Sequence, residues 1–351
     1  MKKCHFVYLA CTAAVVGAGL GAAPASAGHT THVVHEGQSI QKAVDAAASG
    51  DTVLITPGTY RESVTVTTPG LTLRGVGRGV VIEPAAKAAG TCAVGGNGIC
   101  VAGTEKHKVE GVTLASLTVT GFTRSGVYAV ATDGLTVRNV TAVKNGVWGI
   151  AQEGSVRGVF RGNTARDNGD AGLFLANTIS AEKGATDTGG TLVERNRLEG
   201  NRIGVTVRRL RNLTVAGNHL TGNCAGVFLV GDENKPRAGK VTVAENRIVR
   251  NNKSCPKTAR LDALQGSGIV LTGTEDTLIT QNVIRDNAGK SPLSGGIVLF
   301  KSFVGTSSER NRISDNRLSG NSPADLVDQE TAKANTFEAN TCQVSRPAGL
   351  C

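Results

Sequence analysis

A pair of asparagines five residues apart returns along the chain, and it constrains the fold more than any other feature. The clearest units are "VFRGNTARDN" (159–168), "LVERNRLEGN" (192–201), "TVAGNHLTGN" (214–223), "TVAENRIVRN" (242–251), "LITQNVIRDN" (278–287) and "RISDNRLSGN" (312–321), with a weaker copy at 332–340. The tightest return, from Asn196 to Asn218, is 22 residues. Short apolar strands at this period, with no helix between them, predict that the chain coils and that each strand pairs in parallel with its counterpart one turn later. The expected fold is all-β, a parallel β-helix.

The asparagines themselves are expected to form ladders inside the coil. An isolated buried amide costs roughly 1–3 kcal/mol, but amides stacked in register donate to one neighbour and accept from the other. The first column is expected to begin after about residue 160, because Leu117 and Val140 hold its place in earlier turns; it contains Asn163, Asn196, Asn218, Asn246, Asn282 and Asn316. A second column is expected at the next corner, where asparagine tolerates a left-handed backbone; it contains Asn145, Asn168, Asn201, Asn223, Asn251, Asn287, Asn321 and Asn340.

The ends of the chain suggest four segments. Residues 1–27 have a basic start, an apolar stretch and a small-residue "ASA" end, which predicts a signal peptide and an exported, secreted product. Residues 28–60 are expected to hold an extended leader and a capping helix, with Ile40 and Val44 on one face of "QSIQKAVDAAASG" (38–50). The β-helix is expected over 61–341 and a closing tail over 342–351. No second apolar run is long enough to span a bilayer, and we expect a monomer.

Cysteine placement agrees with export to an oxidising compartment. The six cysteines after the signal suggest local pairs, Cys92 with Cys100, Cys224 with Cys255 and Cys342 with Cys351. Disulfides fit better than a metal site because no CxxC occurs. His29, His32 and His35 could bind a metal, but a solvated spacer is the more common role for such a run.

The stretch "SIQKAVDAAASGDTVLITPGTYRESVTV" with "LTLRG" (39–75), followed by the asparagine-bearing turns, resembles the pectate-lyase-like superfamily. The resemblance covers nearly the whole mature chain and implies a single-stranded, right-handed parallel β-helix. It leaves the activity open, because the superfamily includes lyases, hydrolases, esterases, epimerases, periplasmic maturation factors and noncatalytic surface proteins. The short signatures of its pectate lyases, polygalacturonases, pectin esterases and alginate epimerases are absent from this sequence, as is GxSxG.

The charge of the mature chain favours an anionic partner. Without Lys2 and Lys3, 36 basic residues face 28 acidic ones, a net charge of +8. For an exported protein this suggests an acidic polysaccharide or cell-wall polymer, and we expect no nucleic-acid partner. The alternative is that the charge only keeps an elongated surface soluble.

A file of outward side chains is the candidate binding surface. A glycine opens one apolar strand in each turn, at Gly126, Gly146, Gly172, Gly204, Gly226, Gly268 and Gly296. Strand alternation then points Val127 and Val147 inward and places four aromatic residues outward in one file, Tyr128, Trp148, Phe174 and Phe228. With Arg208, Arg209 and Lys301 nearby, the file is expected either to form a glycan groove or to be buried under loops such as 177–190 and 231–240.

Two functions follow from this surface. In the first, a lyase cleaves an acidic polysaccharide by β-elimination, with Arg208 or Lys301 as base and Ca²⁺ held by acids from the group Asp232, Glu153, Asp167 and Asp170. In the second, the coil is a noncatalytic extracytoplasmic protein that binds glycan or wall polymer. A third role, assistance to a metalloenzyme, has little support because Met1 is the single methionine and no Cys/His cluster occurs.

Overall fold

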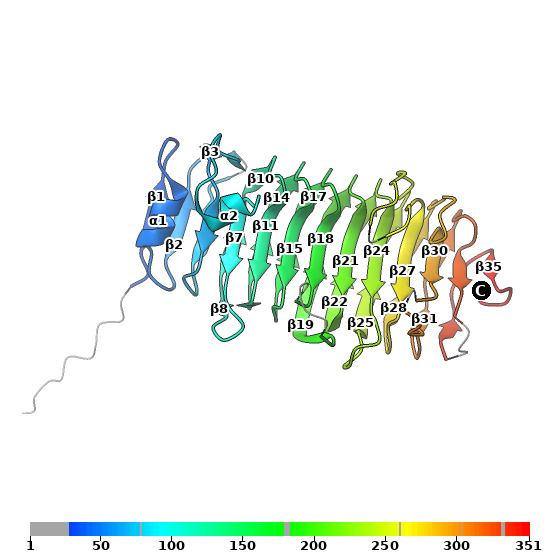
Figure 1. The fold of residues 1–351 in the computed structure, drawn as a ribbon. Coiled ribbons are helices and arrows are strands. Elements are labelled where there is room, and N and C mark those ends of the chain that lie inside the picture. The colour runs from blue at the N-terminus through cyan, green and yellow to red at the C-terminus, as the bar shows by residue number, and fades with distance from the viewer. Residues whose placement is uncertain (1–27, 78, 179–182, 260, 303, 331–333) are drawn as a thin grey trace, which may run out of the picture.

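The computed structural model describes residues 28–77, 79–178, 183–259, 261–302, 304–330 and 334–351, and the predicted signal peptide lies outside them. The chain winds into an elongated coil of three long parallel sheets (Figure 1). The 12-stranded sheet consists of β1 (Thr31–Val34), β2 (Thr52–Ile55), β5 (Thr72–Gly75), β9 (Thr113–Ala115), β13 (Thr136–Arg138), β16 (Val159–Arg161), β19 (Thr186–Glu194), β22 (Leu210–Ala216), β25 (Gly239–Ala244), β28 (Leu278–Thr280), β31 (Arg312–Ser314) and β34 (Thr336–Glu338).

The other two sheets follow in turn around the coil. The 10-stranded sheet consists of β3 (Gly58–Arg61), β6 (Val80–Glu83), β10 (Thr118–Thr120), β14 (Thr141–Val143), β17 (Thr164–Arg166), β20 (Arg197–Glu199), β23 (His219–Thr221), β26 (Arg247–Val249), β29 (Val283–Arg285) and β32 (Arg317–Ser319). The 11-stranded sheet consists of β4 (Val64–Val66), β7 (Ile99–Ala102), β11 (Ser125–Val130), β15 (Trp148–Glu153), β18 (Ala171–Ala176), β21 (Ile203–Arg208), β24 (Ala225–Val230), β27 (Ser267–Thr272), β30 (Gly295–Leu299), β33 (Leu326–Asp328) and β35 (Ser345–Arg346). β8 (Val109–Glu110) and β12 (Thr132–Asp133) form a small separate pair.

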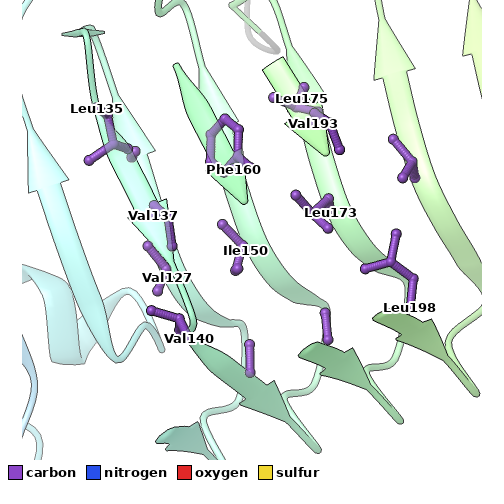
Figure 2. Packing of buried hydrophobic residues seen from close by; sticks show 14 of the residues in the cluster. Val127, Leu135, Val137, Val140, Ile150, Phe160, Leu173, Leu175, Val193 and Leu198 are labelled. Atoms are coloured by element: carbon purple, nitrogen blue, oxygen red, sulfur yellow. The ribbon is translucent and has the colours of Figure 1, made fainter. Parts of the chain in front are cut away.

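The interior of the coil is a column of aliphatic side chains, one layer for each turn. Val127, Ile150 and Leu173 are opposite one another on successive strands and all point inward (Figure 2). Figure 2 also shows Phe160 inside, between the valines and leucines of neighbouring turns. Because each turn contacts mainly the turns before and after it, the packing is repeated rather than central.

Both asparagine ladders are present. In the first column Asn196 Nδ2 donates to Asn218 Oδ1 at 2.9 Å, and Asn218 Nδ2 donates to Asn246 Oδ1 at 3.0 Å. The column begins at Asn163, as expected, since Val140 only supplies a backbone amide to it. Asn340 was placed in the wrong column, because it accepts from Asn316 and so ends the first.

The second column ends on a carboxylate. Asn287 donates to Asn321, and Asn321 Nδ2 donates to Asp325 Oδ1 at 2.8 Å. The expectation that the ladder asparagines of this column themselves adopt a left-handed backbone is also wrong. The left-handed residue is the one before each ladder asparagine, such as Asp167 (φ 56°) before the buried Asn168. The backbone thus turns at the residue before the asparagine, on the outside of the coil, while the asparagine side-chain amide stays inside.

The N-terminal end is closed by α1 (Ile40–Ala46), as predicted. Ser39 caps the helix by accepting from the Lys42 amide, and Glu62 accepts from the amides of Ile40 and Gln41 at 2.7 and 3.1 Å. Ile40 is fully buried against the first turns. The expected leader is already part of the coil, since β1 pairs in parallel with β2, and a second short helix, α2 (Gly90–Val94), was not expected.

The three expected disulfides are confirmed, Cys92–Cys100, Cys224–Cys255 and Cys342–Cys351. No helix among the described residues is long and apolar enough to cross a membrane.

Candidate functional site

The register of the 11-stranded sheet corrects the predicted aromatic file. Tyr128 is opposite Ala151, and the file continues through Phe174 and Phe228, whereas Trp148 is opposite Ser125. The error comes from the glycine column, which passes through Gly149 and not Gly146. A Cβ at Gly149 would lie 2.6 Å from the Gly172 carbonyl oxygen, so this position requires glycine.

The same shift turns other side chains. Ile150, not Val147, follows Val127 inside the coil, and Gln152 points inward and is buried. Glu153 takes the outward position beside Val130, next to Ala176 on the following strand. Trp148 remains on the outer face, where its ring stacks on Phe174 with centroids 4.3 Å apart.

Most of the file is covered and forms a second small core. Trp148, Phe174 and Phe228 are 5%, 7% and 3% exposed. The cover was expected from loops 177–190 and 231–240, but the apolar residues packed on the face come from two other segments; they are Cys255, Leu261, Leu264 and Leu293. An open row of aromatic rings for sugar stacking is therefore not available at Phe228.

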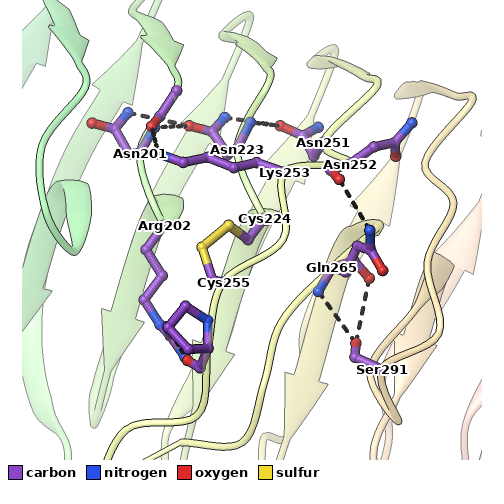
Figure 3. The surroundings of a disulfide bond; sticks show 12 residues. Asn201, Arg202, Asn223, Cys224, Asn251, Asn252, Lys253, Cys255, Gln265 and Ser291 are labelled. Atoms are coloured by element: carbon purple, nitrogen blue, oxygen red, sulfur yellow. Dashed lines mark hydrogen bonds between the residues drawn. A yellow bond between two sulfur atoms is a disulfide. The ribbon is translucent and has the colours of Figure 1, made fainter.

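The covering segment 252–266, of which the structure describes 252–259 and 261–266, is held at several points (Figure 3). The Cys224–Cys255 disulfide joins it to the residue just before β24. Arg202 at the start of β21 donates to the carbonyl oxygens of Pro256 at 2.7 Å and Asp262 at 3.1 Å. Burial lowers the pKa of Arg202, while nearby Asp170 opposes this effect. These links fix the cover over the C-terminal half of the sheet.

The N-terminal half of the face retains polar groups around one exposed arginine. Arg124 is exposed, and its guanidinium lies 5.3 Å from the Trp148 ring centroid and 6.0 Å from that of Tyr128. The Tyr128 hydroxyl donates to Glu153 Oε1 at 2.9 Å, and Trp148 Nε1 donates to Asp170 Oδ2 at 3.1 Å. We call Arg124, Tyr128, Trp148, Glu153 and Asp170 the outer-face cluster.

The electrostatics of the cluster hold Tyr128 in its neutral form. Burial raises the pKa of Tyr128, and the adjacent Glu153 carboxylate raises it further, both by charge and by accepting its hydrogen bond. Arg124 opposes the shift as the smallest contribution. At neutral pH Tyr128 is thus a hydrogen-bond donor and not a phenolate base.

The two predicted bases are not in one site. Arg208 is two strands from Glu153, with the small Ala176 between them, a separation of about 10 Å at ordinary strand spacing. Lys301 follows Phe300, three strands beyond Arg208, so the two are about 14 Å apart or more. Arg209 has a left-handed backbone (φ 51°) and pairs with Asp232.

The predicted calcium ligands do not converge. Asp167 is at an outer corner and pairs with Arg166 at 3.2 Å, Asp232 pairs with Arg209, and Glu153 and Asp170 bind Tyr128 and Trp148. Within the part of the chain that the structure describes, no three His, Cys, Asp or Glu side chains group in a way that could hold a metal ion. The four candidate ligands therefore do not come together in one Ca²⁺ site in this structure.

Sequence reasoning missed Arg124 and the Tyr128–Glu153 pair. A usable signal was present, because Gly149 follows the corner residue Asn145 by four positions, as Gly172 follows Asn168. Counting from the ladder asparagine instead of from the nearest glycine places Glu153 outward next to Tyr128.

Three stacked parallel sheets with an N-terminal capping helix define the fold as a right-handed parallel β-helix. Two family models match parts of the chain, the right-handed β-helix region over residues 86–248 and the periplasmic copper-binding protein NosD over residues 176–346. No curated protein matches it in sequence.

Several solved structures share the fold. The A-module of mannuronan C-5 epimerase AlgE6 from Azotobacter vinelandii is 21% identical, with 87% of this chain and 90% of that one covered and a TM-score of 0.58. A polygalacturonase from Erwinia carotovora ssp. carotovora is 13% identical, with 89% and 92% covered and a TM-score of 0.59. An alginate lyase from Paenibacillus sp. str. FPU-7 is 15% identical, with 91% and 96% covered and a TM-score of 0.54.

The second family model is described as copper-binding, so the question is whether this chain has side chains that could hold copper. Copper favours thiolate, thioether and imidazole ligands. The six cysteines of the described chain are paired in disulfides, and His32 is bound to Asp51 at 3.0 Å. With no metal-ligand group among the described residues, their side chains do not fit a copper site.

Proposed function

We propose that this protein acts outside the cytoplasm and binds an acidic polysaccharide at the outer-face cluster. The observation that carries the proposal is Arg124, whose exposed guanidinium is held over two aromatic rings at the part of the face next to Tyr128 and Glu153. A guanidinium fixed in this way suits a uronate carboxylate, which it can bind through two parallel hydrogen bonds.

Three further observations support the proposal. The mature chain is basic, with a net charge of +8 once Lys2 and Lys3 are removed. The three disulfides favour an oxidising compartment, which agrees with the signal-like start of the sequence. The fold is shared with proteins named for mannuronan, alginate and polygalacturonate chemistry.

β-Elimination is a second candidate, favoured by the Tyr128–Glu153 hydrogen bond. In that reaction a base removes the proton beside the uronate carboxylate, a carbon–carbon double bond forms, the bond to the glycosidic oxygen breaks, and that oxygen takes up a proton. Neutral Tyr128 suits the proton donor, and of the two predicted bases Arg208 is the nearer, two strands from Glu153. We rank binding first, because an ordinary arginine is charged and so holds the proton that a base must accept.

The binding proposal is tested through Trp148, the single tryptophan of the chain. Titration with polygalacturonate or alginate oligosaccharides should change its fluorescence, and the affinity should fall as salt rises. Arg124→Gln should weaken binding about tenfold, as expected for one lost charge-assisted contact. Arg312→Gln, on a different sheet, is the control and should bind normally.

The elimination step is tested by the ultraviolet absorbance of an unsaturated product. Accumulation of product that stops in Tyr128→Phe would establish the second candidate. Absence of both binding and product with every uronate polymer, at low and high salt and with added Ca²⁺, would refute the proposed function.

A further inference from the structure

The face of the 10-stranded sheet carries a column of hydroxyl and cationic side chains that the proposed function does not use. The strand register places six outward residues directly in line, one on each successive turn: Thr118, Thr141, Thr164, Arg197, His219 and Arg247. Adjacent members are about 4.8 Å apart along the coil. We call this the Thr–Arg column.

The fold keeps this face open. The two ladder asparagines that flank the 10-stranded sheet are five residues apart in all six clear turns, from Asn163 and Asn168 to Asn316 and Asn321. An insertion there would break both ladders at once. The covering segment 252–266 instead leaves the coil after β26, beyond the second ladder, and Arg197 and Arg247 are exposed.

The cationic half of the column carries little compensating negative charge. Arg197 pairs with Glu199 at 3.0 Å, but in the described parts of the chain neither His219 nor Arg247 makes an ion pair with a carboxylate. Like charges on neighbouring strands are unfavourable. Burial lowers the pKa of His219, the flanking guanidiniums of Arg197 and Arg247 lower it further, and Glu199 opposes them. A bound anion would relieve this repulsion.

The hydroxyl half of the column lines a hollow. Thr118, Thr141 and Thr164 border a depression of about 630 Å³ at the corner between two sheets, together with Ser116, Asn139 and Gly162. Hydroxyl and amide side chains at this spacing offer hydrogen bonds to the hydroxyls of a sugar. The threonines that border the depression and the cationic residues therefore form one uninterrupted row across neighbouring strands.

From this juxtaposition we infer that the Thr–Arg column is a second binding site, separate from the outer-face cluster, for a linear anionic glycan that runs along the coil axis. Its carboxylate or sulfate groups contact Arg197, His219 and Arg247, and its neutral hydroxyls contact the threonines. Nucleic acid is the less suitable polyanion, since none of the six column residues is Phe, Tyr or Trp and base stacking is the main contact of single-stranded nucleic acids.

The test compares two arginine variants of similar exposure. Arg197→Gln combined with Arg247→Gln removes the cations of the column, while Arg312→Gln removes an ion-paired arginine from the neighbouring sheet; the side chains of Arg197 and Arg312 are 59% and 60% exposed. Binding of polygalacturonate and alginate oligosaccharides is measured by calorimetry at low salt. The double variant should bind about tenfold more weakly and with a smaller salt dependence, and the control within about twofold of wild type.

A second measurement separates local contact from general charge. The NMR titration of the His219 ring should move to higher pKa when saturating polygalacturonate is present, because the anion offsets Arg197 and Arg247. Unchanged affinity in the double variant with an unmoved His219 pKa would overturn the inference. Equal losses in the control, or tighter binding of single-stranded oligothymidylate than of either uronate at the same column, would overturn it too.

Arg124→Gln distinguishes this inference from the proposed function. Loss of binding in Arg124→Gln alone would refute the Thr–Arg column and leave the outer-face cluster standing. Loss in the Arg197/Arg247 double variant alone would support the column and refute the cluster. Losses in both, with two binding events in the wild-type calorimetric titration, would support the two sites together.

Discussion

Replacing one ladder asparagine should be among the most destabilising single changes in this chain. Asn218 is 1% exposed, and its side chain is used on both sides. Its Oδ1 accepts from the backbone amide and the Nδ2 of Asn196, both at 2.9 Å, and its Nδ2 donates to the Val193 carbonyl at 2.9 Å and to Asn246 at 3.0 Å. Asn218→Ala removes all four bonds in the middle of the coil.

The magnitude follows from which groups lose their partners. The Asn196 amide loses its acceptor while remaining buried, at a cost of about 1–3 kcal/mol, and the other lost bonds add about 1 kcal/mol each where no second partner remains. The Asn196 Nδ2 keeps the Phe160 carbonyl, which limits the sum. The Asn246 Oδ1 likewise keeps the Asn218 backbone amide. We therefore expect Asn218→Ala to lower the free energy of unfolding by about 2–4 kcal/mol.

Asn340 provides the matched comparison. It ends the same column, donates to the Ile313 carbonyl alone among the described residues and is half-buried, so that water can replace its amide. Asn340→Ala should cost about 1 kcal/mol. The assay is urea unfolding followed by circular dichroism, with equal slopes required for the comparison. Equal losses for the two variants, or a loss below about 1 kcal/mol for Asn218→Ala, would refute the ladder reasoning.

Three further changes test the N-terminal end, the cover and the outer-face cluster. Asp51 accepts hydrogen bonds from the Thr30 amide, His32 and the Ala48 amide, in order of their effect, and these lower its pKa from 3.8 to about 2. The stability that this provides is present above pH 4 and should be lost as the pH falls toward 2. Urea unfolding of Asp51→Asn should not show this acid-dependent loss of stability, and an identical loss in the variant would contradict the reasoning. Replacing both Cys224 and Cys255 by Ser opens a loop of 31 residues and should lower the free energy of unfolding by about 3–4 kcal/mol. Thermal unfolding compares the double variant with the wild-type protein. An unchanged midpoint would mean that Arg202 alone holds the covering segment. The raised pKa of Tyr128 implies a contribution to the free energy of unfolding that is complete below pH 10 and is lost as the pH rises further. The stability of Tyr128→Phe should therefore fall less than that of the wild type above pH 10. An equal fall in both proteins would show that Tyr128 is not responsible.

The architecture could be predicted from the sequence because one repeated residue type determines it. The asparagines set the register of two corners, and their spacing of five never changes across the six clear turns. Local chemistry also predicted the disulfides and the capping helix, whose Ile40 and Val44 face the core. These features depend on nearby residues or on the repeat itself.

The candidate site was less predictable because it depends on contacts between unlike segments. Gly146 and Gly149 both precede apolar residues, and a Cβ would clash at either position, with the Thr123 carbonyl oxygen at 2.1 Å or the Gly172 carbonyl oxygen at 2.6 Å, so the glycine pattern alone does not fix the strand register. Phe228 is buried by the covering segment 252–266, and the length and composition of this segment do not predict the face on which it packs. Arg124 lies just before its strand, in register with Val147 and Asp170, so no residue type repeats at its position and its place over Trp148 was visible only in three dimensions.

The carboxylate of Asp325 gives the coil a polarity. It accepts from Asn321 and from the Gln343 amide, and it offers no hydrogen to a following residue. In the second column each asparagine Nδ2 donates to the next asparagine toward the C-terminus, and Asp325, four residues after Asn321 in the same turn, accepts the last of these hydrogen bonds. Duplicating an internal turn would lengthen this molecule, whereas a turn added at the end would have to bring its own corner asparagine to the place where Asp325 now accepts from Asn321.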